Sequence, residues 1–275
     1  MAQHPALSAG NVAVITGGAD GIGLAAAHYF KSLGLDVCIA DVDTTKLEQA
    51  QTALGEVLTV VADVSQLADV GKIRGEAYQR YGRVDVLMNN AGVARHCGSW
   101  TEYDAWMKVI DINLWGVING IHSFVPAMVK QGTPAVIINT CSKQGITTPP
   151  GNPAYNVSKA GVKAVTEALQ HDLRNEEGSK VSAHLLVPGF TYTGMVREFL
   201  PDKPDSAWTS EQVVEFMAES LAKGDFYILC PDNDATRELD NKRMAWAMGD
   251  LIENRPPLSR WHPDYQDEFD QFLQE

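Results

Sequence analysis

The segment NPAYNVSKAGVKA, residues 152–164, places a phenol and an amine four residues apart in a stretch with helical character. Residues at positions i and i+4 are neighbours on one face of a helix, so Lys159 is expected beside Tyr155. A phenol has a pKa of about 10, and nearby positive charge is needed to stabilise its anion at neutral pH. Lys159 could supply that charge. By itself, however, such a pair is more typical of an ordinary helix surface.

A glycine-rich turn indicates the cofactor that this chemistry would need. The stretch VAVITGGADGIGLAAAHYF, residues 12–30, reads as a strand, a turn and a helix with the glycine pattern TGxxxGxG. Glycines let the main chain approach a pyrophosphate, and the helix N-terminus presents free N–H groups. Glycine turns also occur for structural reasons alone, but the position between the first strand and the first helix favours a dinucleotide. The predicted contacts are Gly17, Asp20, Gly21, Ile22 and Gly23.

Asp41 ends the next strand about 20 residues further on, where a carboxylate can bond a ribose diol. The same residue could simply end the strand, with Asp43 capping the following helix, and both roles are compatible. A carboxylate there repels a 2′-phosphate, and the next basic residue is Lys46. We therefore expect NAD, with Asp41 and Val42 at its adenosine ribose.

Short apolar runs alternate with segments of helical period, which predicts βαβ units and a parallel sheet. The fold class expected is α/β, a doubly wound seven-stranded parallel sheet of the Rossmann type. The predicted strands are 11–16, 36–40, 57–62, 84–89, 135–140, 181–187 and 226–230. The predicted helices are 22–33, 44–54, 66–81, 101–131, 153–177 and 210–223, with a capping box at Thr209 and Gln212.

Length and composition predict one domain, residues 1–275, with a core at about 10–230, a substrate loop at about 190–210 and a C-terminal extension, 231–275. The net charge of −13 argues against a nucleic-acid partner. The four cysteines show no CxxC spacing and read as reduced packing residues, and we expect no metal site. The N-terminal residues contain no signal peptide or membrane helix, which predicts a cytoplasmic protein without a membrane partner.

Several further motifs occur in one order along the chain, and together they resemble the short-chain dehydrogenase/reductase family over about residues 10–230. They are TGGADGIG, ADV at 62–64, NNAG at 89–92, Asn113 in DINLWG, Ser142 in NTCSKQG, YNVSK at 155–159 and PGFTYT at 188–193. Ser142 precedes Tyr155 by 13 positions, the usual spacing in the family.

The resemblance implies a role for each motif. Asn113, Ser142, Tyr155 and Lys159 would form the catalytic tetrad, and Tyr155 and Lys159 would also contact the cofactor. Asp63 and Val64 would lie against the adenine. The remaining implied cofactor contacts are Asn90, Ala91, Gly92, Pro188, Gly189, Thr191 and Thr193.

These residues define a reaction. Tyr155 would exchange the proton of a substrate hydroxyl while hydride passes between the same carbon and the nicotinamide, and Ser142 would stabilise charge on the substrate oxygen. Asn113 would bind a water that relays protons to Lys159. We expect an NAD(H)-dependent oxidoreductase of a secondary alcohol or its ketone. The alternatives are a relative with epimerase, dehydratase or enoyl-reductase chemistry, and a nucleotide-sensing module without turnover.

The substrate is expected at loops that follow strands. Candidate polar contacts are Arg95, His96, Gln144, Thr191 and Tyr192, and each could equally be a surface-loop residue. Met195, Phe199, Leu200 and Trp208 suggest a cover over an apolar substrate, although packing on a helix would explain them as well. The aromatic tail could cap the pocket or bind another subunit. Apolar residues on 101–131 and 153–177 predict a homodimer or homotetramer: Trp106, Trp115, Ile118, Val162, Val165 and Leu169.

Overall fold

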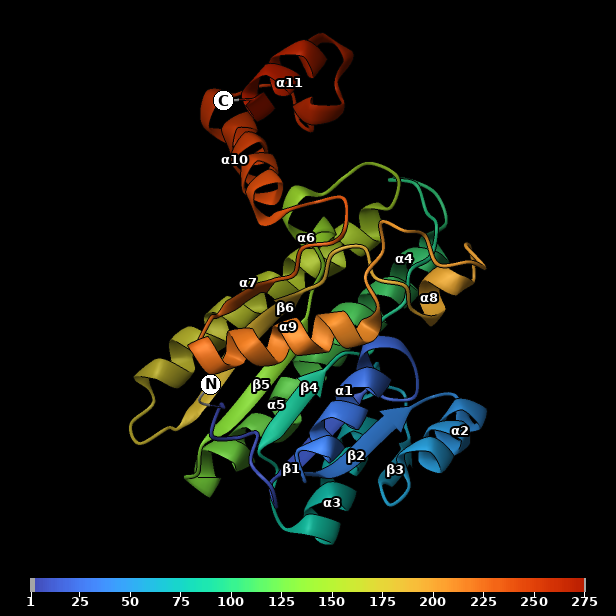
Figure 1. The fold of residues 1–275 in the computed structure, drawn as a ribbon, viewed down its shortest axis with the longest axis vertical. Coiled ribbons are helices and arrows are strands. Elements are labelled where there is room, and N and C mark those ends of the chain that lie inside the picture. Colours follow the sequence, from blue (N-terminus) through green and yellow to red (C-terminus); the bar gives the residue numbers. More distant parts are fainter. Residues whose placement is uncertain (1–2, 275) are drawn as a thin grey trace.

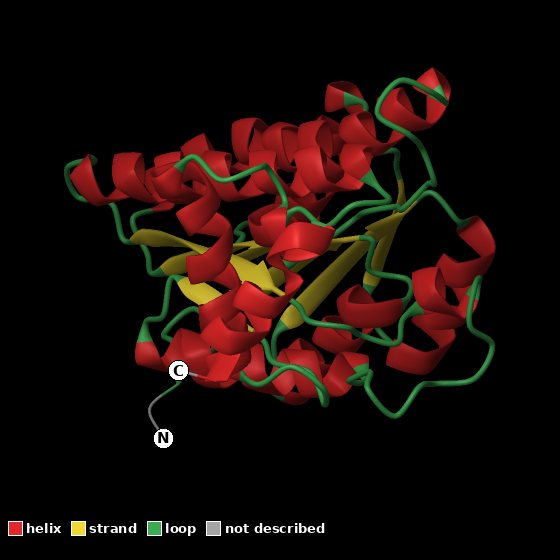
Figure 2. Cartoon of the chain, turned by 90° about the horizontal axis from the view of Figure 1, so that it is seen from above, coloured by secondary structure: helices red, strands yellow, loops and turns green. Residues whose placement is uncertain are grey.

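A computed structural model describes residues 3–274, and it contains one seven-stranded parallel sheet with helices on both faces (Figures 1 and 2). The strand order is β3-β2-β1-β4-β5-β6-β7. The expected doubly wound fold is therefore confirmed. The strands are β1 (Val12–Thr16), β2 (Asp36–Asp41), β3 (Leu58–Val61), β4 (Val86–Asn89), β5 (Ala135–Thr140), β6 (Val181–Val187) and β7 (Tyr227–Leu229). Met1, Ala2 and Glu275, at the predicted domain ends, lie outside the described residues.

Six long helices cover the sheet. The first apolar core lies between the sheet and α1 (Gly21–Ser32), α2 (Thr44–Leu54) and α9 (Ser210–Lys223). The second core lies on the other face, beneath α3 (Leu67–Tyr81), α5 (Gly116–Gln131) and α7 (Pro153–Asn175). Strands β1, β4 and β5 are buried along their whole length, as parallel strands covered on both faces must be.

The helix ends follow the sequence signals. Thr209 and Gln212 form the expected capping box at α9, and Gly224 ends that helix with a φ of +78°. Asn152 caps α7 by accepting a hydrogen bond from the Tyr155 amide, with Pro153 at the first helical position. The start of α7 is thus fixed by local chemistry, and this fixes the direction in which Tyr155 and Lys159 point.

The predicted helix 101–131 is interrupted. Its observed parts are α4 (Tyr103–Ile110), a π-helical turn η1 (Asp111–Trp115) and α5. A π turn inserts an extra residue into the helical ladder and commonly marks a functional site. Here the insertion contains Asn113, whose side chain is fully buried.

This helical stretch also has the length and apolar character of a membrane span, from Tyr103 to Gln131. That resemblance is weak, because Phe124 and Met128 on the same stretch are completely buried in the core beneath the sheet. We interpret it as a core helix.

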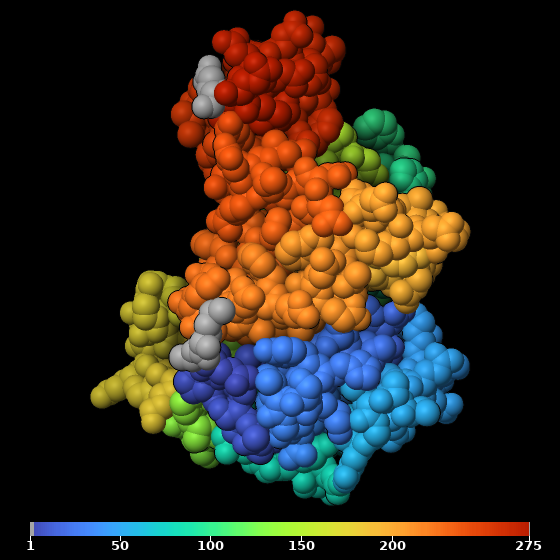
Figure 3. Space-filling model, viewed as in Figure 1, coloured from blue at the N-terminus to red at the C-terminus, as the bar shows by residue number. Residues whose placement is uncertain are grey.

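The loop after β6 and the chain after β7 depart from the alternation of strands and helices. The loop contains one short helix, α8 (Gly194–Arg197), and a second short helix, α6 (Gln144–Thr147), follows β5. The C-terminal extension consists of α10 (Arg237–Glu253), the 3-10 turns η2 (Ser259–Trp261) and η3 (Pro263–Tyr265), and α11 (Gln266–Gln274). It projects from the body beyond α6 (Figures 1 and 3).

Candidate active site

The strand order reverses between β1 and β4, and the predicted cofactor motifs lie at this switch point. The glycine turn follows β1, and Asn90, Ala91 and Gly92 follow β4. Gly17 has a φ of +60°, and a Cβ there would come within 2.8 Å of the Ala91 Cα atom. The main chains of the two loops therefore approach closely, as a dinucleotide crevice at a switch point requires.

Asn90 ties these two loops together. Its main-chain N–H donates to the Thr16 hydroxyl (3.0 Å), and its side-chain amide donates to the carbonyl oxygens of Thr16 and Gly17 (3.3 and 3.2 Å). The sequence assigned Asn90 to the cofactor. The structure gives it a further role, because these bonds hold the glycine turn in shape.

Asp20 caps α1 at the end that would face a pyrophosphate. Its carboxylate accepts hydrogen bonds from the Gly21 amide (2.7 Å), Lys46 Nζ (2.9 Å) and Arg197 Nη2 (2.7 Å). Burial opposes ionisation, but the hydrogen bonds from Lys46, Gly21 and Arg197 hold the pKa of Asp20 below its usual value. The two cations also offset the negative charge that Asp20 brings to this helix N-terminus.

Asp41 ends β2 next to the glycine turn. Its Oδ2 accepts a hydrogen bond from the Ala19 amide (3.4 Å), and its Oδ1 accepts one from the Asp43 amide (3.1 Å). Asp43 caps α2 through the Lys46 amide, so the turn role is confirmed, and the contact of Asp41 with a ribose stays a prediction. Val42 is largely exposed beside them.

Ser142 and Tyr155 are brought together from β5 and α7. The Ser142 hydroxyl lies close enough to the Tyr155 hydroxyl to affect its pKa, and Ser142 Oγ accepts a hydrogen bond from the Gln144 amide (3.2 Å). Burial raises the pKa of Tyr155 to about 12, although the nearby Ser142 hydroxyl opposes this rise. In the absence of cofactor, Tyr155 is therefore a neutral phenol at pH 7.

Lys159 lies on the same helix face, with Nζ 5.7 Å from the centre of the Tyr155 ring. Its ammonium donates to the Thr140 carbonyl oxygen (2.8 Å), and its side chain is almost fully buried. Burial lowers the pKa of Lys159 to about 8. The expected proximity is present, but burial outweighs any lowering of the tyrosine pKa by Lys159 in this state.

Asn113 reaches the same site from the π turn. Its Oδ1 accepts the Val93 N–H (2.8 Å), and its Nδ2 donates to the Val93 carbonyl oxygen (2.9 Å) and to Ser158 Oγ (3.2 Å). A Cβ placed on Gly92 would lie 3.4 Å from Asn113 Oδ1 and 3.6 Å from Lys159 Nζ. Asn113 and Lys159 therefore both lie beside the loop after β4, and the Asn113 side chain fastens that loop.

The other predicted cofactor residues follow β3 and β6. Asp63 accepts the Ser65 amide (2.9 Å), and the buried Val64 packs against Gly116. The loop after β6 contains Pro188, Gly189, Thr191 and Thr193. A Cβ on Gly21 would lie 3.2 Å from Thr193, so this loop meets the glycine turn.

The five predicted polar substrate contacts occupy different environments. Gln144 is adjacent to Ser142, and Arg95 pairs with Glu198 across the loops (3.8 Å). His96 is exposed, Thr191 is buried, and the Tyr192 hydroxyl donates to the Pro201 carbonyl oxygen.

The apolar residues predicted to cover the substrate in the 190–210 loop include both packed and exposed side chains. Trp208 packs on Phe216 of α9, and its main chain pairs with Phe190 and Tyr192, so packing explains this residue. Phe199 and Leu200 remain exposed.

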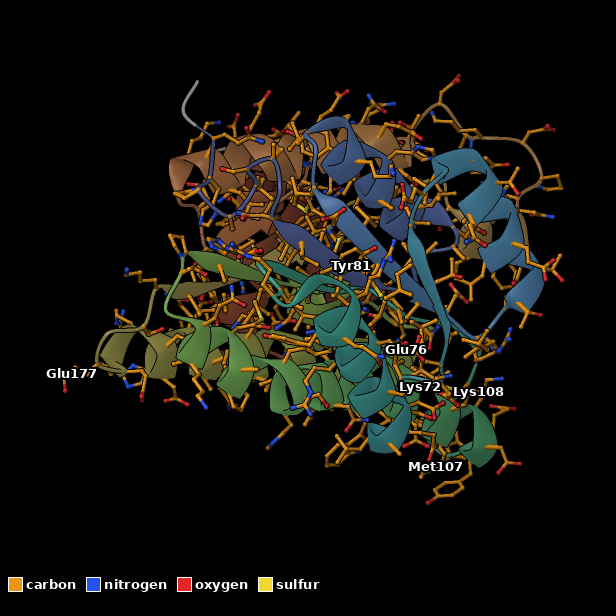
Figure 4. All side chains as sticks on the ribbon, turned by 90° about the horizontal axis from the view of Figure 1, so that it is seen from below. Lys72, Glu76, Tyr81, Met107, Lys108 and Glu177 are labelled. Atoms are coloured by element: carbon orange, nitrogen blue, oxygen red, sulfur yellow. The ribbon has the colours of Figure 1, made fainter. Side chains whose placement is uncertain are left out.

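Burial on the long helices changes which of the predicted residues can form a subunit interface. Val162 and Leu169 are buried within this chain, and Trp106 donates its indole N–H to the Gly98 carbonyl oxygen. Burial removes Val162 and Leu169 from the predicted interface, whereas the half-buried Trp106 stays a predicted contact. Trp115 is exposed, and Met107 lies with Lys108 at the outer surface of α4 (Figure 4).

Sequence reasoning missed Lys143, which follows Ser142 directly. Its Nζ pairs with Asp232 Oδ2 (3.1 Å) and Asp240 Oδ2 (2.6 Å) from the chain after β7. Asp232 also accepts the Phe190 amide (3.1 Å), so these pairs connect three loops around the site. The position of Lys143 next to Ser142 was a signal, but its partners lie 89 residues or more away.

Comparison with known proteins agrees with this geometry. The family model described as short chain dehydrogenase matches residues 11–204. The chain therefore belongs to the short-chain dehydrogenase family, a family of Rossmann-fold oxidoreductases.

Individual relatives cover most of the chain. A 1-deoxy-11-beta-hydroxypentalenate dehydrogenase of Streptomyces exfoliatus is 30% identical and covers 90% of this chain and 93% of its own. A 3-oxoacyl-[acyl-carrier-protein] reductase of Thermotoga maritima is 36% identical, covering 70% and 79%. Among solved structures, a short-chain dehydrogenase/reductase from Burkholderia phymatum in complex with NAD is 33% identical, with a TM-score of 0.82 over 90% of this chain and 96% of that one.

Proposed function

We propose that this protein is an NAD(H)-dependent oxidoreductase that interconverts a secondary alcohol and its ketone, with Tyr155 as the acid and base. The neighbouring hydroxyls of Ser142 and Tyr155, with the buried Lys159 beside them, carry this proposal. A hydroxyl and a phenol that converge on one point suit an oxygen atom that gains or loses a proton during reaction.

The crevice fits a dinucleotide. As a residue of the first turn of α1, Ile22 has a main-chain N–H without an intrahelical acceptor, which suits a pyrophosphate oxygen. Asp41 would accept hydrogen bonds from the adenosine ribose hydroxyls and would repel a 2′-phosphate, and Lys46 is already paired with Asp20. The relative from Burkholderia phymatum, which was solved with NAD, supports the same choice. When bound, NAD would exchange hydride with the substrate carbon.

Residues of the chain would transfer the proton to or from the substrate oxygen. With a pKa of about 12, Tyr155 is in the form that donates a proton to a ketone oxygen. Loss of that proton in the oxidative direction requires more positive charge than the free protein supplies. Lys159, with a pKa of about 8, keeps its charge at pH 7. Ser142 would bond the substrate oxygen, and Asn113 would position the loop after β4.

The relatives support alcohol and ketone chemistry. One is named as a dehydrogenase of a hydroxy compound and another as a reductase of a 3-oxoacyl group. Phe199 and Leu200, exposed in the substrate loop, favour a substrate with an apolar body.

Assembly and location complete the proposal. Exposed apolar side chains on α4, η1 and α7, among them Met107, Trp115 and Val157, favour a homodimer or homotetramer through these helices. All four cysteines are buried free thiols, in keeping with the reducing cytoplasm.

A substrate screen tests the central claim. Purified protein would be given aliphatic and cyclic secondary alcohols with NAD⁺ or NADP⁺, and the matching ketones with NADH or NADPH, while absorbance at the nicotinamide band is followed. We expect turnover of at least one pair with NAD(H) preferred. Absence of turnover across the panel, with NADH still bound, would favour a nucleotide-sensing role instead.

A further inference from the structure

A second cavity, of about 230 Å³, lies between α6 and the C-terminal extension. We call it the arginine pocket, because Arg243 of α10 and Arg260 of η2 both line it. Its wall also includes apolar side chains from four separate elements, α6, β7, α10 and η2, namely Ile146, Leu229, Met244 and Trp261. A mostly apolar cavity with a few convergent charged groups is the usual form of a small-molecule site.

The pocket adjoins the catalytic residues. Gln144 lines it, and the amide of the same residue donates to Ser142 Oγ, which lies beside Tyr155. The pocket wall therefore begins at Lys143, the residue directly after Ser142. A ligand held there could extend along α6 towards the crevice.

The charges in the pocket do not cancel. Lys143 also lines the cavity, but its ammonium is already paired with Asp232 and Asp240. Arg243 has one weak pairing, with Nη1 4.0 Å from Asp240 Oδ1. Three cations therefore face two carboxylates, which leaves an excess of one positive charge in a protein whose net charge is −13.

The two guanidinium groups have unused hydrogen-bonding capacity. Within residues 3–274, Arg243 Nε is buried without a hydrogen-bond partner, and Arg260 has no carboxylate oxygen within 4.0 Å. Arg260 instead lies over the rings of Trp261 and Phe269, 4.8 and 5.4 Å from their centres. Burial and the charge of Arg243 lower the pKa of Arg260 from its usual value. A bound anion would relieve both effects.

We propose that the arginine pocket binds the carboxylate of an oxo acid or hydroxy acid, whose apolar body packs against Met244 and Trp261 while its reactive carbon lies at Tyr155. This inference rests on the proposed function, which it narrows to a substrate class. Guanidinium groups bind carboxylates through paired hydrogen bonds. One excess positive charge matches one carboxylate, whereas a phosphate ester carries about −1.5 to −2 at pH 7.

Matched substrates test the proposal by activity. Methyl-ketone acids from 5-oxohexanoate to 9-oxodecanoate would be compared with their methyl esters, which keep the ketone and lose the charge. We expect kcat/KM to be at least about tenfold higher for the acid at one or more chain lengths, because hydrogen bonds to charged groups contribute about 1.5–3 kcal/mol. Equal values for acid and ester at every length would overturn the proposal.

Variants locate the effect. Arg243→Met and Arg260→Met should each lower the acid-to-ester ratio of kcat/KM by about 10–100-fold, for the same reason. Arg260→Lys, which keeps the charge, should retain part of the preference. Arg237→Met removes an exposed arginine from the same helix and should keep the wild-type ratio. An unchanged ratio in both pocket variants would contradict the assignment.

A binding measurement separates this inference from the proposed function. Calorimetric titration with octanoate and with 1-octanol needs no turnover and no cofactor. Octanoate should bind the wild type more tightly than octanol, and this difference should disappear in Arg243→Met and Arg260→Met. If no ketone is turned over, the proposed function fails. The titration then still tests whether the arginine pocket binds a carboxylate. Octanoate binding that persists in both variants would overturn the proposal that the arginine pocket binds the carboxylate.

Discussion

The Lys159 ammonium donates a hydrogen bond to the Thr140 carbonyl oxygen, with Nζ and O 2.8 Å apart, at the end of β5. This bond joins the catalytic helix α7 to the strand that leads into Ser142. It also gives a nearly fully buried ammonium a partner that carries no opposite charge, and burial lowers its pKa to about 8. Keeping the Lys159 ammonium charged in this buried position therefore lowers the stability of the folded protein.

That cost predicts a dependence of stability on pH. The unfolded lysine, with a pKa near 10.5, binds a proton that the folded protein releases from about pH 8 upward. Stability rises with pH wherever the unfolded state binds more protons. The penalty from burying the charge is thus fully present below pH 8 and disappears as pH rises to about 10.5.

Urea unfolding of wild type and Lys159→Met at pH 7, 8.5 and 10 measures this effect. The free energy of unfolding of the wild type, minus that of the variant, should increase by up to about 3 kcal/mol between pH 7 and pH 10. The comparison removes contributions from other groups that titrate in the same range. A difference that stays constant with pH would mean that the ammonium is not desolvated in the folded protein.

Tyr155→Phe should reduce kcat by at least about 10²–10⁴-fold, the usual contribution of a positioned acid or base. NADH binding, followed by fluorescence, should persist, because the ring remains. Lys159→Ala is expected to weaken both binding and turnover. Near-normal activity of the phenylalanine variant would remove Tyr155 from its proposed role.

Asp41→Ala should narrow the preference for NAD⁺ over NADP⁺ by about tenfold or more, because the variant no longer repels a 2′-phosphate. The measurement is kcat/KM for each cofactor at one saturating alcohol concentration. Asp43→Ala is the control, because this neighbour caps α2 and should affect stability more than cofactor choice. A wild-type preference for NADP⁺ would contradict the prediction.

We propose that the predicted substrate loop at 190–210 closes over the substrate. Hydrogen exchange can separate its fixed part from its mobile part. The Trp208 amide donates to the Phe190 carbonyl oxygen (2.9 Å), and this pairing should protect Trp208 in the free protein. Exposed residues such as Phe199 and Leu200 should exchange quickly and slow markedly with NADH and a substrate analogue. Equal exchange in both states would indicate a fixed wall.

Trp115→Glu tests the proposed assembly. The indole is half exposed on η1, so a charge there should disrupt a subunit interface and leave the fold intact. Sedimentation of wild type should give a dimer or tetramer mass, and the variant should shift towards the monomer. Val42→Glu, which changes an exposed apolar residue after β2 and outside these helices, serves as the control. A wild-type monomer at all concentrations would contradict the proposal.

The sequence by itself determined the elements and much of the site. The strands and the predicted helices, apart from the interrupted one at 101–131, begin and end within a few residues of the predicted positions, because caps, glycines and apolar periods act locally. The spacing between Tyr155 and Lys159 placed both on one face of α7 for the same reason. The motif order then indicated which side chains meet in the crevice.

Tertiary structure decided what depends on distant partners. Lys159 bonds a carbonyl oxygen 19 residues away, Asn113 acts from a π turn that no local signal indicated, and Trp208 belongs to a helix contact instead of a pocket cover. Val162 and Leu169 show why an apolar helix face is ambiguous, since the pattern reports burial without naming the partner. The arginine pocket is formed by α6, β7, α10 and η2, segments that only the folded chain brings together.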